Sequence, residues 1–176
     1  MLKRYFPCAY APDVHAIDYQ KLLEKGYKAV LFDVDNTLVP HNRDATPEAE
    51  ALLERVRSMG LQVLLVSNND APRMERFLKN VRFPYVCDAE KPTRKGYDQA
   101  LQMLGITAKE AVFIGDQMFV DVCGANRAGI DSIMVHYIVV NQKEPIGIRR
   151  HIENVILFFY NLCKSAHKLE DAIRKE

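Results

Sequence analysis

The sequence KAVLFDVDNTL, at residues 28–38, runs from an apolar segment directly into two acidic residues. Residues 28–32 are almost continuously apolar, which is typical of a strand that is covered on both faces of a parallel sheet. Asp33 and Asp35 follow where that strand gives way to a loop. Ligands of open parallel sheets bind beyond the carboxyl ends of the strands, and two neighbouring carboxylates there repel each other unless a cation offsets them. The pattern therefore predicts a metal site. A turn or helix cap made by one aspartate fits a lone residue better than an Asp-x-Asp-x-Thr sequence after an apolar strand.

Apolar segments alternate with helix-like segments on both sides of this strand. Further strands are expected at residues 61–66, 84–87, 111–114 and 130–135. Helices are expected from Thr46-Pro47 to Gly60, before Gly105 and before Gly129, because a proline near the start and a glycine after the end are typical of helices. The alternation predicts an α/β three-layer fold with a five-stranded parallel sheet in the order 3-2-1-4-5. Apolar residues at helical spacing also predict a long terminal helix at about 149–175, which packs on the sheet or contacts a membrane or partner.

The composition is that of an ordinary globular protein. The 176 residues include 24 Lys plus Arg and 23 Asp plus Glu, so the formal net charge is +1. That balance gives no long-range field that attracts a polyanion, and we expect no nucleic-acid partner. The four cysteines lie far apart, which favours reduced structural thiols over a zinc site or a disulfide framework. No signal-peptide pattern is found and no apolar run reaches the ~20 residues of a membrane span, so we expect a cytoplasmic protein, at most peripheral at a membrane.

Polar residues at the ends of the other predicted strands complement the two aspartates. Ser67 and Asn68 follow the second strand and suit a phosphoryl oxygen, although an Asx turn fits them equally well. Lys91 lies after the third strand, where a lone lysine is more often simply solvated. Asp116 follows the fourth strand and is expected to reach the same ion as the first aspartate, because adjacent strands lie roughly 5 Å apart. Asp121 begins the next helix, which it could also merely cap.

The chain resembles the haloacid dehalogenase (HAD) superfamily in its four motifs, which are Asp33-x-Asp35-x-Thr37, Ser67, Lys91 and Gly115-Asp116-x-x-x-x-Asp121. It further resembles the YqeG-like branch, subfamily IIIA, which extends to phosphatidylglycerophosphate phosphatases of mitochondria and plastids. The resemblance covers most of residues 1–140 and implies a Rossmannoid fold of the HAD type.

The resemblance implies a Mg²⁺-dependent phosphomonoester hydrolase. In HAD phosphatases the residue that matches Asp33 attacks phosphorus and forms an aspartyl-phosphate, and the residue that matches Asp35 protonates the leaving oxygen and later activates water. The resemblance places Mg²⁺ between Asp33, the backbone carbonyl of Asp35, and Asp116, with Asp121 close by or linked through water. Such a hard cation removes the repulsion between the carboxylate and a dianionic phosphate. An acid at position 35 favours phosphoester hydrolysis over dehalogenation or ion pumping.

The resemblance also assigns the phosphate-binding groups, and position in the chain adds two residues of a substrate-facing loop. Ser67, Asn68 and Lys91 match the groups that bind the transferred phosphoryl oxygens, and Lys91 also offsets the charge of the carboxylates. His41 and Arg43 lie in the loop after the catalytic strand, where an open site contacts the leaving group. These two residues are therefore candidates for substrate contact.

The spacing of the motifs leaves no room for a cap domain. The 34 residues from Asp33 to Ser67 and the 24 from Ser67 to Lys91 are each consumed by a loop, a helix and a strand. We therefore expect one capless domain over residues 1–176, with its core at about 15–140. Open sites suit large or surface-presented substrates, and the resemblance makes phosphatidylglycerophosphate the leading specific substrate. Phosphates of soluble metabolites, nucleotides or proteins are the alternatives, and the sequence leaves the oligomeric state open.

Two other classes of protein share part of this pattern. Phosphate-receiving signalling domains also place acids, a hydroxyl and a lysine on a five-stranded parallel sheet, but there the lysine comes last. Here Lys91 precedes Asp116, which argues against a receiver. A HAD-fold interaction protein that has lost turnover is the second alternative, and the intact Asp35 and Lys91 argue against it.

Overall fold

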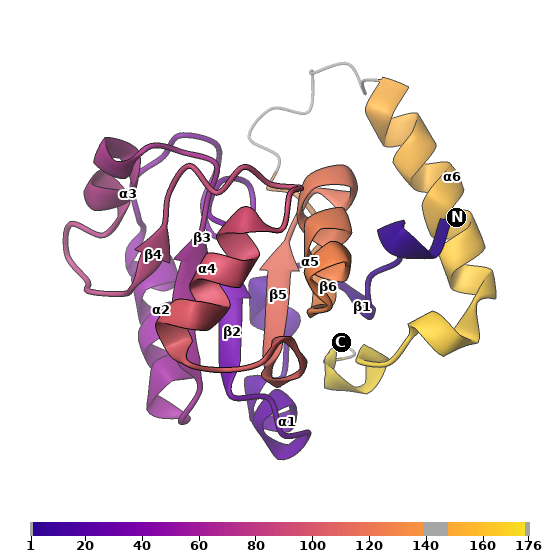
Figure 1. Cartoon of the computed structure of the whole chain (residues 1–176), viewed down its shortest axis with the longest axis horizontal. Helices are drawn as coiled ribbons and strands as arrows, with labels where there is room; N and C mark the ends of the chain where they lie inside the picture. The colour runs from indigo at the N-terminus through magenta and orange to yellow at the C-terminus, as the bar shows by residue number, and fades with distance from the viewer. Residues whose placement is uncertain (1, 139–147, 175–176) are drawn as a thin grey trace.

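A computed structural model describes residues 2–138 and 148–174, with side chains described up to 138 and from 152 to 174. Its centre is a sheet whose strands all run parallel, in the order β1-β6-β5-β2-β3-β4. The strands are β1 (Ala9–Ala11), β2 (Ala29–Phe32), β3 (Gln62–Val66), β4 (Tyr85–Val86), β5 (Ala111–Gly115) and β6 (Asp131–Val135). In Figure 1 the carboxyl ends of β3 and β5 point to the upper edge of the molecule.

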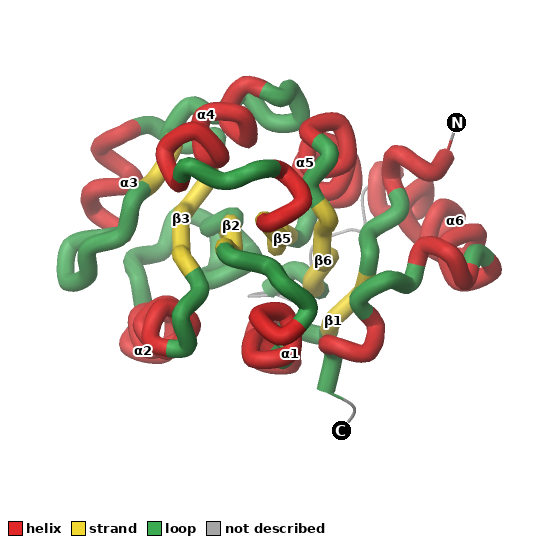
Figure 2. Tube along the Cα trace, turned by 60° about the horizontal axis from the view of Figure 1, so that its bottom comes forward, coloured by secondary structure: helices red, strands yellow, loops and turns green. Residues whose placement is uncertain are grey.

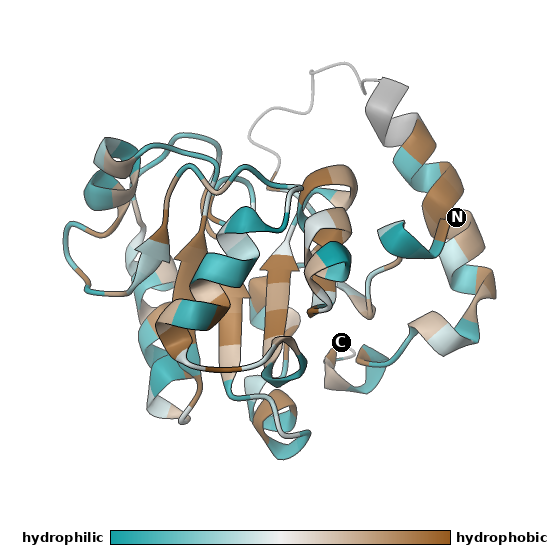
Figure 3. Cartoon of the chain, in the orientation of Figure 1, coloured by the Kyte–Doolittle hydropathy of each residue, from teal (hydrophilic) through white to brown (hydrophobic). Residues whose placement is uncertain are grey.

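Helices cover both faces of the sheet and make the three-layer α/β architecture that was expected. The helices are α1 (Tyr19–Glu24), α2 (Pro47–Ser58), α3 (Ala71–Phe77), α4 (Lys95–Leu104), α5 (Cys123–Ala128) and α6 (Ile148–Leu162). Figure 2 shows α1 and α2 on one side of the strands and α4 and α5 on the other. Val30 and Phe32 pack in the core cluster that contains residues of α1 to α3, whereas Leu31 packs in the cluster that contains α4 and α5. Strand β2 is thus buried on both faces, and Figure 3 shows the strands as the most hydrophobic part of the chain.

The sheet has six strands rather than the expected five. The five expected strands are present, and their order agrees with 3-2-1-4-5. The additional strand β1 extends the sheet beyond β6, with Ala9 opposite Ile133 and Ala11 opposite Val135. Three residues in the sequence Ala-Tyr-Ala carry no periodic pattern, so this strand exists only because its backbone groups pair with β6.

Local sequence signals account for the helices that were expected. The side chain of Thr46 accepts a hydrogen bond from the backbone N–H of Ala49, and Pro47 occupies the first turn of α2. Gly60, with φ at +99°, follows the end of this helix. A threonine cap and a glycine in the left-handed region are the typical boundaries of a helix, and they fix α2 beside β3.

The C-terminal segment differs from the single helix that was expected at 149–175. Helix α6 ends at Leu162, because Cys163 leaves the helical region with φ at −101° and ψ at 77°. The chain then folds back along the N-terminal segment, where Leu169 donates to the backbone oxygen of Cys8 and Arg174 to that of Ala16. These long-range hydrogen bonds outweigh the local helical pattern. A short stretch of sequence does not reveal them, because their partners lie far apart in the chain. Residues 175–176 lie outside the described part of the chain.

Helix α6 packs on the body of the protein with one face and leaves the other exposed. Ile156 and Tyr160 are buried, and the Tyr160 ring contacts Phe6 with 5.9 Å between centroids. Figure 1 accordingly shows α6 beside the N-terminal segment. The exposed face carries large apolar side chains, namely Ile152, Val155, Phe158, Phe159 and Leu162. Among the described residues, none of the helices combines the length and the apolar character that a bilayer crossing requires.

Candidate active site

The candidate residues gather at the carboxyl edge of three adjacent strands. Asp33 follows β2, Ser67 follows β3 and Asp116 follows β5. The register pairs Phe32 with Leu65 on one side and with Ile114 on the other, so the three strands end at similar heights. The parallel sheet therefore brings together residues that lie far apart in the sequence.

Three carboxylates form one buried cluster at this edge. Asp33, Asp116 and Asp121 each offer an oxygen that lies within 4.8 Å of the others. The ammonium group of Lys91 lies 2.6 Å from Asp33 Oδ1 and 2.8 Å from Asp121 Oδ1. All four side chains are buried, so these charges interact with little screening by water.

The electrostatics of the cluster favour an added cation. Burial raises the pKa of Asp33 to about 6, and the nearby Lys91 opposes that rise. Burial disfavours the charged form of Lys91, but the carboxylates of Asp121 and Asp33 outweigh it and raise the pKa of the lysine. Three carboxylates against one ammonium leave an excess of negative charge. Oxygen ligands in this number fit a hard divalent cation such as Mg²⁺, so the residues present suit the metal that the fold implies.

Two neighbouring residues hold Asp121 in place. Asp121 lies in a π-helical turn, Met118–Val122, and its Oδ2 accepts a hydrogen bond from the backbone N–H of Gln117 at 3.0 Å. The buried hydroxyl of Tyr97 donates to the backbone oxygen of Asp121 at 3.0 Å. A Cβ atom at Gly115 would lie only 2.6 Å from Cγ of Asp121, so only glycine allows this close approach. The glycine of the Gly-Asp motif therefore has a steric role.

Asp35 lies apart from the acidic cluster and has its own partners. Its Oδ1 accepts from Arg73 Nη2 at 2.8 Å and from the backbone N–H of Asn42 at 3.0 Å. Its Oδ2 accepts from Asn69 Nδ2 at 2.9 Å. Asp33 instead contacts Lys91, 2.6 Å from its Oδ1. The two aspartates therefore face different surroundings.

The predicted phosphate-binding residues lie beside the cluster. Ser67 is buried, and its Oγ accepts from the backbone and the side chain of Asn69. The Asn68 side chain exchanges two hydrogen bonds with the backbone of Lys91, at 2.7 and 3.1 Å. Asn68 therefore fixes the position of the loop that carries Lys91, and its own side-chain amide is committed to that loop.

The two predicted substrate-loop residues differ in the group that contacts the site: His41 uses its side chain and Arg43 its backbone. The exposed His41 ring lies 3.5 Å from Asp35 Oδ2. Arg43 is exposed, and its backbone oxygen accepts from Arg73 Nη2 at 2.7 Å. The sequence reasoning missed Arg73 altogether. Its position in the first turn of α3, just after the end of β3, is the signal that would have placed it at this edge.

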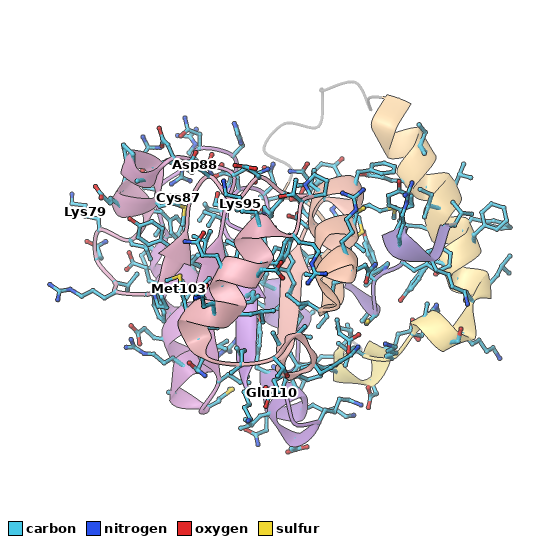
Figure 4. All side chains as sticks on the ribbon, in the orientation of Figure 1. Lys79, Cys87, Asp88, Lys95, Met103 and Glu110 are labelled. Atoms are coloured by element: carbon cyan, nitrogen blue, oxygen red, sulfur yellow. The ribbon has the colours of Figure 1, made fainter. Side chains whose placement is uncertain are left out.

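A polar cavity of about 570 Å³ opens next to Asp35. It is lined by Asn42, Asn68, Asn69, Asp70, Pro72, Arg73, Arg76 and Asp88. Figure 4 shows Asp88 at the upper edge, where the strands end, and Glu110 at the opposite edge. The cavity therefore lies at the same edge of the sheet as the carboxylate cluster. Residues that contact Asp35 form part of the cavity wall.

Comparison with known proteins identifies the family. A family model described as haloacid dehalogenase-like hydrolase matches residues 40–129. "Probable phosphatase YqeG" of Bacillus subtilis (strain 168) is 33% identical over 159 residues, which cover 89% of this chain and 92% of that protein. The chain belongs to the haloacid dehalogenase-like hydrolase family. The expected enzyme class and the resemblance to the YqeG-like branch are thereby confirmed.

More distant relatives agree with this assignment. "Phosphatidylglycerophosphate phosphatase 1, chloroplastic" of Chlamydomonas reinhardtii is 26% identical over 151 residues, or 78% of this chain. The chain spans 55% of that relative's length. A crystal structure of an uncharacterized protein from Listeria monocytogenes serotype 4b superposes with a TM-score of 0.54 at 22% identity. It covers 77% of this chain and 99% of its own, and it supports the fold of this HAD-family hydrolase.

Proposed function

We propose that this protein is a Mg²⁺-dependent phosphomonoester hydrolase that acts through an aspartyl-phosphate on Asp33. The observation that carries the proposal is the buried cluster of Asp33, Asp116 and Asp121 at the carboxyl edge of the sheet, with Lys91 in contact with Asp33 and Asp121. Such a cluster combines a nucleophilic carboxylate with groups that bind a cation and a phosphoryl oxygen.

Each candidate residue has a role that its surroundings support. A carboxylate oxygen of Asp33 attacks phosphorus, while the Lys91 ammonium, 2.6 Å from Asp33, binds a phosphoryl oxygen and offsets charge. Ser67 and the backbone near Asn68 bind further oxygens of the same group. Asp35, held away from the cluster, protonates the leaving oxygen and later takes a proton from the attacking water. Separate surroundings for two carboxylates suit separate roles as nucleophile and acid.

The metal site would be formed by Asp33, Asp116, Asp121 and the backbone carbonyl of Asp35. Bound Mg²⁺ neutralises the negative charge of the phosphoryl group and so permits approach of a carboxylate. The remaining groups work by position: Lys91 links Asp33 to Asp121, and Gly115 allows Asp121 to approach.

We include in the proposal a single capless domain and a lipid-borne substrate, with phosphatidylglycerophosphate as the leading candidate. Only α2 lies between β2 and β3, and only α3 between β3 and β4, so the chain around the site is short. The polar cavity beside Asp35 suits a hydrated headgroup rather than an acyl chain. A relative that carries the phosphatidylglycerophosphate phosphatase name supports the same substrate.

Peripheral contact with a membrane belongs to the same proposal. The exposed apolar face of α6, which includes Val155, Phe158 and Leu162, supports it, because an amphipathic helix binds in the interfacial region of a bilayer. Sedimentation with anionic vesicles tests this part. Replacing Val155 and Leu162 with serine is expected to weaken binding while leaving turnover of soluble phosphates unchanged.

The proposal is tested by measuring phosphate release with Mg²⁺ from phosphatidylglycerophosphate in mixed micelles and from a panel of sugar, nucleotide and protein phosphates. Turnover should vanish in Asp33→Asn and persist in the matched control Asp98→Asn, an exposed aspartate of α4. Faster turnover of a soluble phosphate would overturn the lipid substrate. No turnover of any phosphate by the wild-type protein would leave a HAD-fold interaction protein.

A further inference from the structure

Arg73 is a buried cation that neither the motifs nor the family comparison assigns to the reaction. It lies in the first turn of α3, and 7% of its surface is exposed. Nη2 donates one hydrogen bond to Asp35 Oδ1 at 2.8 Å and another to the backbone oxygen of Arg43 at 2.7 Å. One nitrogen atom thus connects the proposed acid to the loop that carries Arg43.

The two carboxylate oxygens of Asp35 have different partners. Arg73 and the backbone N–H of Asn42 both bind Oδ1. Oδ2 is bound by Asn69 Nδ2, and that same nitrogen lies 2.9 Å from Ser67 Oγ. Oδ2, which also lies 3.5 Å from His41 Nδ1, is therefore on the side of the proposed phosphate-binding hydroxyl, while Oδ1 is held by Arg73 and the backbone of Asn42.

Helix α3 holds this loop at a second point. Arg76, one turn after Arg73, lies 2.9 Å from Asp44 Oδ1 through Nε and donates to Asn42 Oδ1 at 2.6 Å. Residues 42–44 are thereby fixed by two arginines on one face of the helix. The position of Asp35 therefore depends on where helix α3 places these two arginines.

Two nitrogens of Arg73 have no protein partner within the described part of the chain, and the residue helps to line the polar cavity beside Asp35. Both hydrogens of Nη2 are used, but Nε and Nη1 are buried and find no hydrogen-bond partner among the described residues. Buried donors without protein partners are rare in native proteins, and a functional role or a bound water accounts for many of them. The guanidinium group of Arg73 also lies 5.7 Å from the centroid of the Phe77 ring, but this cation–π contact offsets little of the missing hydrogen bonding.

We propose that Arg73 is the positioning residue of Asp35, holding the carboxylate through Oδ1 so that Oδ2 serves the leaving group. This inference rests on the proposed function. In the step concerned, a bond forms between Asp33 and phosphorus, and the bond between phosphorus and the leaving oxygen breaks. The electron pair of that bond remains on the leaving oxygen, which takes a proton from Asp35.

The test uses two substrates that differ in their need for that proton. Nitrophenolate leaves readily without protonation, whereas an alkoxide does not, so misplacing an acid slows the alkyl substrate more. The kcat/KM of Arg73→Met is therefore compared for p-nitrophenyl phosphate and for glycerol 1-phosphate. We expect a loss of about 100-fold with the alkyl substrate and less than about 5-fold with the aryl substrate.

Five further variants separate a positioning role from a general loss of activity. Asp35→Asn should show the same selectivity, and adding Arg73→Met to it should cause little further loss with the alkyl substrate, because both changes remove one function. Arg73→Lys, which keeps the charge, should retain part of the activity, and guanidinium ion should partly restore Arg73→Ala. Arg94→Met, an exposed arginine paired with Asp98, is the matched control and should behave as wild type.

The outcomes distinguish this inference from the proposed function. Equal losses of Arg73→Met on the two substrates, or additive losses with Asp35→Asn, would overturn the positioning role while the phosphatase function stands. If Arg73→Met does not fold, the same comparison made with Arg73→Lys decides the question. Absence of turnover by the wild-type protein would instead refute the proposed function.

Discussion

Gly115→Ala is expected to damage the metal site through a steric effect alone. An added methyl carbon at this position would lie 2.6 Å from both Cγ and Oδ2 of Asp121, and 2.7 Å from its Cβ. Ordinary contacts between such atoms begin at roughly 3.5 Å, so Asp121 has to move by about 1 Å. That movement breaks the 2.8 Å contact between Asp121 and Lys91 and opens the carboxylate cluster.

The magnitude follows from two separate effects. Overpacking of this kind costs about 1–3 kcal/mol of the free energy of unfolding, which for a chain of this length lowers Tm by roughly 2–12 °C. Mg²⁺ requires oxygen ligands at about 2.1 Å in near-octahedral geometry, so loss of one supporting carboxylate weakens metal affinity by about 10- to 100-fold.

The assay is calorimetric titration of the folded variant with Mg²⁺, together with thermal unfolding. Gly105→Ala is the matched control, because Gly105 has a φ of 65° with open space around the added carbon. It should lower Tm through backbone strain and leave the metal affinity unchanged. If Gly115→Ala binds Mg²⁺ as tightly as the wild type does, the carboxylate cluster is not the metal site and the steric reasoning is wrong.

Three other predictions concern stability. Thr46→Ala removes the cap bond to Ala49 and should lower the free energy of unfolding by about 1 kcal/mol, measured in urea against an exposed Ser58→Ala. Tyr97→Phe leaves the backbone oxygen of Asp121 without its buried donor and should cost about 1–3 kcal/mol in the same assay; no change would show that this hydrogen bond is dispensable. Burial raises the pKa of Cys8 from 9.0 to about 11, so the folded state keeps a proton that the unfolded state releases. Stability should fall by up to about 3 kcal/mol between pH 9 and 11, and urea titrations should show a smaller fall in Cys8→Ala.

The sequence located the candidate site because its residues follow strands. Asp33 and Asp116 could be placed at one edge, since parallel strands that end together bring their following residues together. Lys91 was placed in the same way, and the structure positions its ammonium group between Asp33 and Asp121. The roles of these residues remain predictions for the assays above.

Other features depend on contacts between distant segments, which no local pattern encodes. Arg73 and Asp35 lie 38 residues apart, and nothing in either neighbourhood specifies their 2.8 Å contact. The end of α6 at Leu162 was missed for the same reason, because the chain after it is held by backbone bonds to residues near the N-terminus.

The amino-acid sequence by itself determined the parallel α/β architecture, the order of five strands, the family resemblance and the acidic residues at the strand ends. Periodicity, caps and motif spacing are local properties, and a buried strand must be apolar wherever it lies. Only the tertiary structure decided the sixth strand β1, the fold-back of the C-terminal segment, and the different surroundings of Asp33 and Asp35. Hydrogen bonding and burial of those groups arise from segments that meet only when the whole chain has folded, so their energies appear in no stretch of sequence taken alone.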